Sequence, residues 1–491
     1  MVHLNAFNLT VPCGLLFTTH EQLLSPTLHH GEQHERIATD LGAGPPGDRL
    51  IVGESGKGGL QMTAQDRSAV DAATRKRAVA AAVIGNFVEW YDFVIYAYFA
   101  TVLATLFFPS ESRFASLMAT FAVFGVSFVV RPLGALVIGS YGDRLGRRNT
   151  LAVVILLMSG ATFLIGVLPT YQSIGILAPL LLALTRAIQG FSVGGEFGGA
   201  TSFMIEYAPE GRRGLYGSWQ FSTQGLSLMT GATLGILLTL LVSEETLFAW
   251  GWRVPFLIAL PFGLIGLYLR LRLEDTPHFR AILETERVES TPLRQTLRTH
   301  GGDILKVIGT IFYATAIVYL FIYMPTYLPE VFGISRTQTF VANVVGLSTF
   351  VVLCFVVAVL SERVGRKPFL VGGPLCAVIL TYPAFLLLQG GFLAILLAHI
   401  IFGFLIGFFG GVAAAAFSEF FPTRVRYSAL SLGYSVSVSI FGGTSPLIFT
   451  YLLESTGNPI SPAFYILGAA LVSLVATLTI AETAGKPLPD T

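Results

Sequence analysis

The dominant feature of this chain is a succession of apolar runs, each about 20 residues or longer. A hydrocarbon core about 30 Å thick is crossed by roughly 20 apolar residues in an α-helix, so such runs predict membrane-spanning helices. Only 12% of the 491 residues are charged, whereas soluble proteins average about 25%. We therefore predict an all-α membrane protein with twelve spans, near residues 78–107, 114–139, 150–169, 173–205, 214–243, 253–272, 304–328, 339–360, 368–388, 391–416, 428–453 and 462–481.

A charged interval at residues 273–303 cannot lie in lipid, and it divides the spans into six plus six. We predict an N-terminal six-helix half at 75–272, a cytoplasmic linker at 273–303, a C-terminal half at 304–486 and a tail at 487–491. Residues 1–74 contain no spanning run, and their longest apolar stretch, near 11–17, is too short for a signal-peptide core. We expect a disordered cytoplasmic tail there, or a start site assigned too early.

The distribution of basic residues predicts the orientation in the membrane, because short cytoplasmic loops are enriched in Lys and Arg. The loops after spans two, four, eight and ten carry ten such residues, and the loops on the other face carry three. Both termini are therefore expected in the cytoplasm, and the protein in the cell membrane. The ten are Arg144, Arg147, Arg148, Arg212, Arg213, Arg363, Arg366, Lys367, Arg424 and Arg426; the three are Arg113, Arg253 and Arg336.

The two halves repeat. Residues 143–148 (DRLGRR) match residues 362–367 (ERVGRK) at an offset of 219, and residues 206–213 match 419–426 at an offset of 213. Six spans separate the copies, so both have the same orientation. This pattern predicts parallel halves with a substrate cavity between them, and alternating access by rocking of the halves.

Five ionisable residues lie inside predicted spans, and each costs about 2.5 to 3.5 kcal/mol in the bilayer centre. They are Glu89 and Asp92 in span one, Arg131 in span two, and Arg186 and Glu196 in span four. Arginine keeps its proton, so three carboxylates face two permanent cations and one carboxylate lacks a counterion. The functional interpretation is proton coupling by Glu89, Asp92 and Glu196. The alternative is an ion-pair network that only orders the helices.

Several residues at similar depth are candidates for substrate binding. Arg186 and Gln189 are three apart, and a guanidinium suits a substrate carboxylate, although Glu89 or Asp92 could instead neutralise Arg186. Aromatic side chains could enclose a quaternary ammonium by cation–π contact, or could face lipid or the protein core. The candidate set is Asn86, Trp90, Tyr91, Arg131, Arg186, Gln189 and Tyr313.

Other classes of chemistry find no support in the sequence. The formal net charge of +1 argues against a nucleic-acid partner. The odd number of cysteines, three, argues against a disulfide framework. The Gly53–Gly58 segment does not match the spacing of a phosphate-binding loop. We expect no metal and no cofactor other than the proton as coupling ion, and a monomer that suffices for transport.

The motifs resemble those of the major facilitator superfamily, and within it the metabolite:proton symporter family, over about residues 75–486. The resemblance implies the twelve-helix fold of that superfamily and proton-coupled uptake of a small organic solute, by a carrier and not by an enzyme. The motifs are residues 85–93 (GNFVEWYDF), 131–134 (RPLG), 142–148 (GDRLGRR), Arg186, Gln189-Gly190, Gly194-Gly195-Glu196, Glu206-Tyr207, 421–424 (FPTR) and Arg426.

The resemblance also implies a gate. In this superfamily the charges of the loop after span two hold the cytoplasmic helix ends together when the carrier faces outward. The gating candidates are Asp143, Arg144, Gly146, Arg147 and Arg148, with their second-half counterparts Glu362, Arg363 and Arg366.

The substrate is indicated by segments at the ends of spans. Residues 252–256, 273–277 and 426–430 look most like those of proline/glycine betaine carriers. A carboxylate such as α-ketoglutarate, citrate or shikimate is the alternative, and a membrane sensor that transports nothing is a more distant one.

Overall fold

A computed structural model describes residues 72–145, 147–193, 196–206, 208–209, 211–271, 293–486 and 488. The predicted N-terminal tail up to residue 71 and the linker up to residue 292 lie outside these ranges. Every regular element in the described part of the chain is a helix. In hydrocarbon, a helix satisfies all of its backbone hydrogen bonds internally, which is why long apolar runs fold this way.

The helices reproduce the predicted six-plus-six succession. Among the described residues, nine helices are long and apolar enough to cross a membrane, two bent helix pairs pass the same test together, and Ala152–Val167 is a shorter apolar helix. The twelve predicted spans are consistent with this set. Helix α13 begins eleven residues earlier than the predicted span at 304–328, at Leu293, so the last part of the predicted linker is helical.

The first half comprises α2 (Ala72–Tyr98), α3 (Ala100–Phe107), α4 (Arg113–Leu145), α5 (Arg147–Val167), α6 (Tyr171–Ile174), α7 (Leu177–Val193), α8 (Glu196–Glu206), α9 (Arg213–Leu241), α10 (Glu244–Thr246), the π-helical turn η1 (Leu247–Gly251) and α11 (Arg253–Leu271). The second half comprises α13 (Leu293–Phe332), α14 (Arg336–Val364), α15 (Lys367–Leu387), α16 (Phe392–Phe420), α17 (Thr423–Ser437), η2 (Val438–Gly442), α18 (Ser445–Thr456) and α19 (Ser461–Leu478).

Two spans are bent. Helices α2 and α3 meet at 61°, and the α10–η1 segment meets α11 at 47°. At Phe99, between α2 and α3, the backbone hydrogen bonds continue, from the Phe99 N–H to Ile95 and from the Leu103 N–H to Phe99. The bend therefore leaves no backbone group unsatisfied at this point, as burial in an apolar bundle requires.

Helices within each half approach closely at glycines. A Cβ on Gly190 of α7 would overlap the backbone of Ser127 in α4, and a Cβ on Gly403 of α16 would overlap the backbone of Gly346 in α14. The offsets of 213 and 219 relate these two contacts, so the same packing occurs once in each half. Gly190 and Gly403 thus let their helices approach closely.

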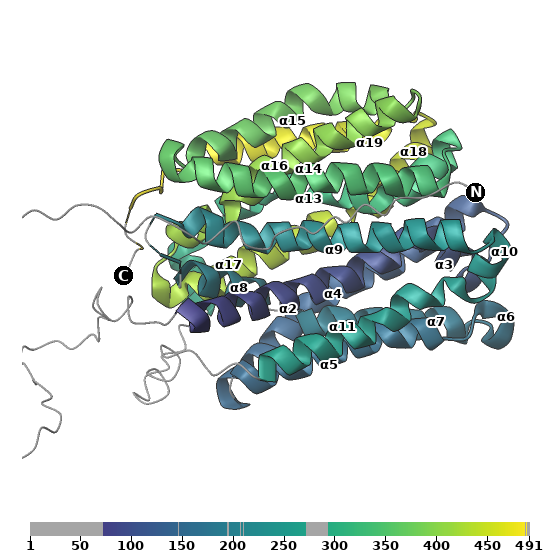
Figure 1. Ribbon diagram of the computed structural model, residues 1–491, viewed down its shortest axis with the longest axis horizontal. Coiled ribbons are helices and arrows are strands. Elements are labelled where there is room, and N and C mark those ends of the chain that lie inside the picture. Colours follow the sequence, from purple (N-terminus) through teal and green to yellow (C-terminus); the bar gives the residue numbers. More distant parts are fainter. Residues whose placement is uncertain are drawn as a thin grey trace, which may run out of the picture. The chain divides into compact units, whose positions relative to one another are not determined.

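The two halves lie against each other chiefly through α9 with α14 and α16 and through α8 with α17. Smaller contacts join α4 to α18 and α2 to α13. Figure 1 shows α13–α16 and α19 on one side of α9, and α5, α7 and α11 on the other. The surface away from this contact exposes large apolar side chains such as Val129, Leu241, Leu393 and Val475. Such an apolar exterior is suited to lipid rather than water.

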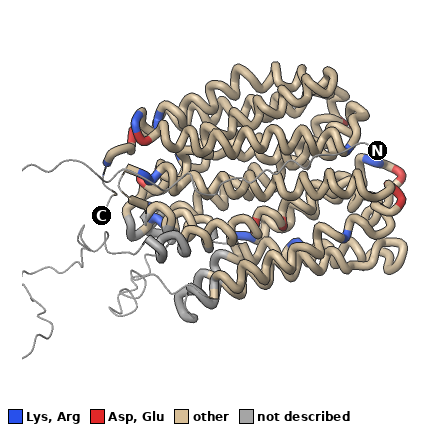
Figure 2. The backbone as a smooth tube through the Cα atoms, viewed as in Figure 1, with Lys and Arg blue, Asp and Glu red and all other residues tan. Residues whose placement is uncertain are grey.

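Charged residues gather at the ends of the helices, and only a few lie between the ends (Figure 2). We call the end that carries Arg212, Arg213, Arg363, Arg366 and Lys367 the basic end, and the other the opposite end.

Candidate functional site

Four of the five predicted intramembrane charges are described with their side chains, and all four are buried. Glu89, Asp92, Arg131 and Arg186 are each at most 4% exposed. The side chain of Glu196 lies outside the described residues. Burying an ion in a medium of low dielectric costs several kcal/mol unless a partner compensates, so the partners of each group define what the site can do.

Arg131 and Glu89 form an ion pair between α4 and α2. The Arg131 Nη2 atom lies 3.8 Å from the Glu89 Oε1 atom. The guanidinium also lies over the rings of Phe93 and Phe128, 4.6 and 4.7 Å from their centroids. The pair is long for a charge-assisted hydrogen bond, whose usual length is about 2.7 to 2.9 Å. The two groups attract each other without being locked together.

Arg186 is held by neutral groups instead. Its Nη1 donates to Gln189 Oε1 at 2.6 Å and its Nη2 donates to Ser127 Oγ at 2.9 Å. Gln189 in turn donates to the Thr162 hydroxyl. The rings of Phe93, Tyr96 and Phe124 flank the guanidinium at 4.6 to 5.1 Å. This network ties α4, α5 and α7 together deep in the first half.

Asp92 is the exception among these groups. It is 1% exposed, and neither carboxylate oxygen has a hydrogen-bond partner in the described part of the chain. Thr162 and Arg186 are electrostatic neighbours, but the Thr162 hydroxyl donates to Met158 O at 3.1 Å. The Asp92 carboxyl is therefore buried without a hydrogen-bonded counterion among the described residues.

Two further candidates on α2 fasten that helix to its neighbours. Two hydrogen bonds join the Asn86 side chain to Gln220, from Asn86 Nδ2 to the Gln220 backbone oxygen at 2.8 Å and from Gln220 Nε2 to Asn86 Oδ1 at 3.0 Å. Tyr91 donates to Pro255 O in α11 at 2.7 Å. Both contacts lie within the first half.

A cavity lies between the halves beside the Arg131–Glu89 pair. Its volume is only about 20 Å³, so it is narrow in this structure, and among the described residues its lining contains no charged side chain. Gln224 and Thr315 are polar lining residues, and six aromatic residues line the rest of it together with aliphatic ones: Trp90, Phe221, Tyr319, Phe350, Phe409 and Tyr434.

Of the seven residues predicted to bind substrate, Trp90 alone is among the described lining of this cavity. Tyr313 lies on another face of α13, where its hydroxyl is 3.5 Å from Leu405 O. Sequence reasoning missed Tyr319 and Tyr434. The one signal for Tyr319 was the concentration of tyrosines between residues 313 and 327.

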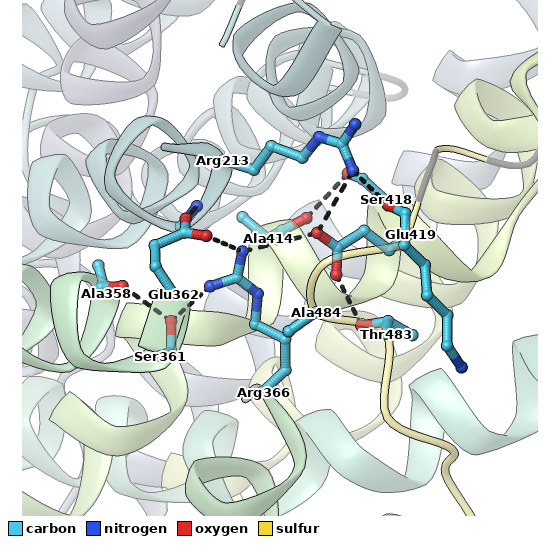
Figure 3. Close-up of polar contacts among 12 residues, drawn as sticks. Arg213, Ala358, Ser361, Glu362, Arg366, Ala414, Ser418, Glu419, Thr483 and Ala484 are labelled. Atoms are coloured by element: carbon cyan, nitrogen blue, oxygen red, sulfur yellow. Dashed lines mark hydrogen bonds and ion pairs between the residues drawn. The ribbon is translucent and has the colours of Figure 1, made fainter. Parts of the chain in front are cut away.

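The basic end is closed by a charge cluster that crosses between the halves (Figure 3). Arg366 lies 3.0 Å from Glu362 and 3.6 Å from Glu419, all in the second half. Arg213 of the first half lies 4.0 Å from Glu419, and the Gly214 N–H at the start of α9 donates to Glu362. Glu362 and Arg366 were predicted at a gate, and both lie in this cluster.

The segment after α19, residues 480–486, joins this cluster; we call it the C-terminal segment. Glu482 accepts hydrogen bonds from the backbone N–H groups of Arg366 and Lys367, at 2.8 and 2.9 Å. The Thr483 hydroxyl donates to Glu419 at 2.6 Å, and Arg213 donates to Lys486 O at 2.9 Å. The C-terminal segment therefore contacts both halves.

Partial burial alone would raise the pKa of Glu482. The backbone N–H groups of Ala484, Arg366, Lys367 and Thr483 that donate to the carboxylate outweigh burial and lower the pKa below its ordinary value.

The opposite end also carries contacts between the halves. Arg113 of α4 pairs with Glu330 of α13 at 2.6 Å, and Arg336 of α14 pairs with Glu244 at 3.3 Å. The Thr337 hydroxyl donates to Thr239 at 2.9 Å. The central cavity thus lies between two sets of inter-half contacts.

Several gating candidates lie outside what the structure describes. Residue 146 is not described, and neither are the side chains of Asp143, Arg144, Arg147 and Arg148. Arg363 is exposed at the end of α14. Among the described residues, no group of three or more His, Cys, Asp and Glu side chains is arranged to hold a metal ion.

Comparison with known proteins places the chain among membrane carriers. The profile of the Major Facilitator Superfamily matches residues 82–442. The glycine betaine/proline/ectoine/pipecolic acid transporter OusA of Dickeya dadantii (strain 3937) is 38% identical over 435 residues, which cover 86% of each protein. The citrate-proton symporter of Klebsiella pneumoniae is 38% identical over 402 residues, 80% of this chain and 89% of that relative.

The fold is also found among solved structures. The proton:xylose symporter XylE bound to 6-bromo-6-deoxy-D-glucose matches with a TM-score of 0.68 and 19% identity, over 85% of this chain and 98% of that one. At this identity the match concerns the fold.

Proposed function

The chain belongs to the major facilitator superfamily, and on that premise we propose that it is a proton-coupled symporter that imports a small zwitterionic osmolyte of the proline/glycine betaine type. It works by alternating access in the cell membrane, with both termini in the cytoplasm and the basic end facing inward. One copy of the chain suffices for transport, and the proton is the coupling ion.

The observation that carries this proposal is the position of the central cavity beside buried carboxylates. The cavity has a lining without charge among the described residues, which suits a solute with no net charge. Tyr319 and Tyr434 line it and are electrostatic neighbours of Arg131 and Glu89. A solute that enters the cavity therefore comes within reach of groups that can exchange a proton.

Roles for the predicted residues follow from their surroundings. Asp92, without a bonded partner, carries the proton, and Glu89 couples its release to the solute through Arg131. Glu196 is a further proton site of the same half. Arg186, Gln189 and Asn86 hold the helices that position these groups. Glu362 and Arg366 belong to the inner gate.

A carboxylate symporter is the second candidate. The citrate-proton symporter of Klebsiella pneumoniae favours it, since that relative is also 38% identical. A di- or tricarboxylate needs several cationic partners. Arg131 is engaged with Glu89 and Arg186 is bonded to Gln189 and Ser127, so this site offers little free positive charge.

Uptake into proteoliposomes tests the proposal. We expect an inward proton gradient to stimulate uptake of radiolabelled proline or glycine betaine and to leave citrate, α-ketoglutarate and shikimate at background. Stimulated uptake of a carboxylate alone would replace the osmolyte assignment with the second candidate. Gradient-independent uptake of proline would contradict proton coupling.

A further inference from the structure

Tyr319 and Tyr434 belong both to the cavity and to the surroundings of the buried ion pair. They come from α13 and α17 of the second half, whereas Arg131 and Glu89 come from the first. Each is an electrostatic neighbour of both members of the pair. The two tyrosines are thus the second half's side of a site whose charges lie in the first half.

The rings of these residues are fixed by aromatic neighbours. Tyr434 stacks on Phe197 with centroids 3.5 Å apart and planes within 2°, so Phe197 covers one face of its ring. Tyr319 packs against Phe124 and Phe128 at 6.1 and 5.9 Å. Trp90 lies 6.5 Å from Tyr319. The cavity wall is therefore preorganised and rich in π-faces.

The ammonium group and the carboxylate group of a zwitterion need different partners in such a wall. No carboxylate is among the described lining residues, so an ammonium group there has aromatic faces as its partners, which attract cations by their quadrupole. A carboxylate needs donors. The Tyr319 hydroxyl is buried without a hydrogen-bond partner in the described residues, and Arg131 is an electrostatic neighbour of Tyr319.

We propose that Tyr319 and Tyr434 determine substrate specificity, by offering their rings together with that of Trp90 to the cationic group of a zwitterion whose carboxylate lies toward Arg131. This inference rests on the proposed function and goes further, because it assigns recognition of the cation to aromatic faces. The carboxylate of the solute then competes with Glu89 for Arg131.

A comparison of two ligands tests the cation directly on the unaltered protein. Tert-butylacetate has the shape of glycine betaine, with carbon in place of the quaternary nitrogen. We expect it to inhibit uptake of radiolabelled glycine betaine at least about tenfold more weakly than unlabelled glycine betaine does, because the cation–π attraction is lost. Equal or stronger inhibition by tert-butylacetate would overturn the inference.

Variants test the residues. Tyr319→Phe and Tyr434→Phe keep the ring, whereas Tyr319→Leu and Tyr434→Leu remove it. We expect the leucine variants to raise the KM for glycine betaine by about tenfold, and Tyr434→Phe to change it less than about threefold. Phe402→Leu is the matched control, because Phe402 is a buried aromatic residue of α16 that is not among the described lining of the cavity.

The outcomes separate this inference from the proposed function. If the wild-type protein carries glycine betaine and both leucine variants keep its KM, the aromatic assignment fails and the function stands. If the wild-type protein carries no osmolyte, both fail. If a leucine variant does not fold, as judged by gel filtration, the ligand comparison on the unaltered protein decides.

Discussion

At the scale of single residues, the buried charged groups of the first half have three kinds of surroundings. Arg131 and Glu89 balance each other at 3.8 Å, Arg186 is satisfied by two neutral oxygens, and Asp92 has no hydrogen-bond partner among the described residues. Because a buried charge without compensation is costly, we assign the coupled proton to Asp92. Under the proposed function, Asp92 carries the proton and the Arg131–Glu89 ion pair couples its release to the solute.

Replacing Asp92 should separate accumulation from binding. A membrane potential of about 100 mV contributes about 2.3 kcal/mol per charge moved, so entry of a neutral zwitterion with one proton supports an accumulation of about 50-fold. In Asp92→Asn the carboxyl that carries the coupled proton is gone, and we expect this ratio to fall to about one while exchange of labelled for unlabelled solute continues. The ratio is measured in proteoliposomes with an imposed potential.

Glu89→Gln is the companion variant, since it leaves Arg131 without its partner. We expect it to lose accumulation as well. Wild-type accumulation by both variants would remove Glu89 and Asp92 from the coupling mechanism. Glu454→Gln, at an exposed glutamate of α18, is the control and should accumulate solute normally.

The sequence could predict the depth of these residues but not their partners. Depth depends on the position of a residue within its span, at about 1.5 Å per residue. Which side a residue faces depends on the rotation of its helix, which packing against other helices sets. This is why Glu89, Asp92, Arg131 and Arg186 were found in the sequence, with an ion-pair network as one interpretation. Which carboxylate pairs with which arginine, and the cavity positions of Tyr319 and Tyr434, could not be predicted.

At the scale of helices, close approach at glycine fixes how α4 and α7 cross. The Ser127 backbone occupies the position that a side chain on Gly190 would need, and Ser127 also binds Arg186. The packing of the two helices and the position of the arginine therefore depend on one contact.

Gly190→Ala should be strongly destabilising. The added methyl overlaps backbone atoms that cannot rotate away, and overpacking of this kind costs about 1 to 3 kcal/mol or more. Gly160→Ala is the matched control, because nothing lies within 4 Å of an added Cβ there, and alanine favours a helix over glycine by about 1 kcal/mol. We expect a lower Tm for Gly190→Ala in detergent and an unchanged or higher one for Gly160→Ala. Equal Tm values would refute the close approach.

Glu482 of the C-terminal segment makes the stability of the folded protein depend on pH. The pKa of Glu482 is lower in the folded protein than in the unfolded chain, so its contribution to stability is fully present above the unfolded pKa, about 4.3. It is lost as the pH falls through the lowered value. We expect the Tm of the wild-type protein to drop in this acidic range.

Glu482→Gln tests this dependence. The amide oxygen still accepts hydrogen bonds but carries no charge, so the variant should have a lower Tm at pH 7 and a smaller drop in acid. A pH profile identical to that of the wild type would show that the segment does not depend on this carboxylate.

At the scale of the whole molecule, the halves touch at both ends and enclose the cavity between them. The fold was predictable because twelve apolar runs and two repeated motifs define two parallel halves, with no need to know any side-chain contact. The contacts between the halves were only partly predictable. The repeat pointed to Glu362 and Arg366. Two other contacts could not be predicted, because they depend on how α9 packs on α14 and α16: Thr239 with Thr337, and Gly217 with Ala414.

Locking either end should stop transport if the halves move against each other. An added Cβ on Gly217 lies 3.2 Å from the Ala414 Cβ atom, and the Thr239 and Thr337 hydroxyls are 2.9 Å apart, so cysteine pairs at these positions lie close to disulfide geometry. In a background without the three native cysteines, we expect oxidation of either pair to abolish uptake and reduction to restore it. Gly309 and Ala476, both in the second half and 2.9 Å apart by the same measure, provide a control pair whose oxidation leaves the halves free to rock. Full uptake with a complete disulfide at either inter-half pair would mean that access to the cavity does not require those helices to separate.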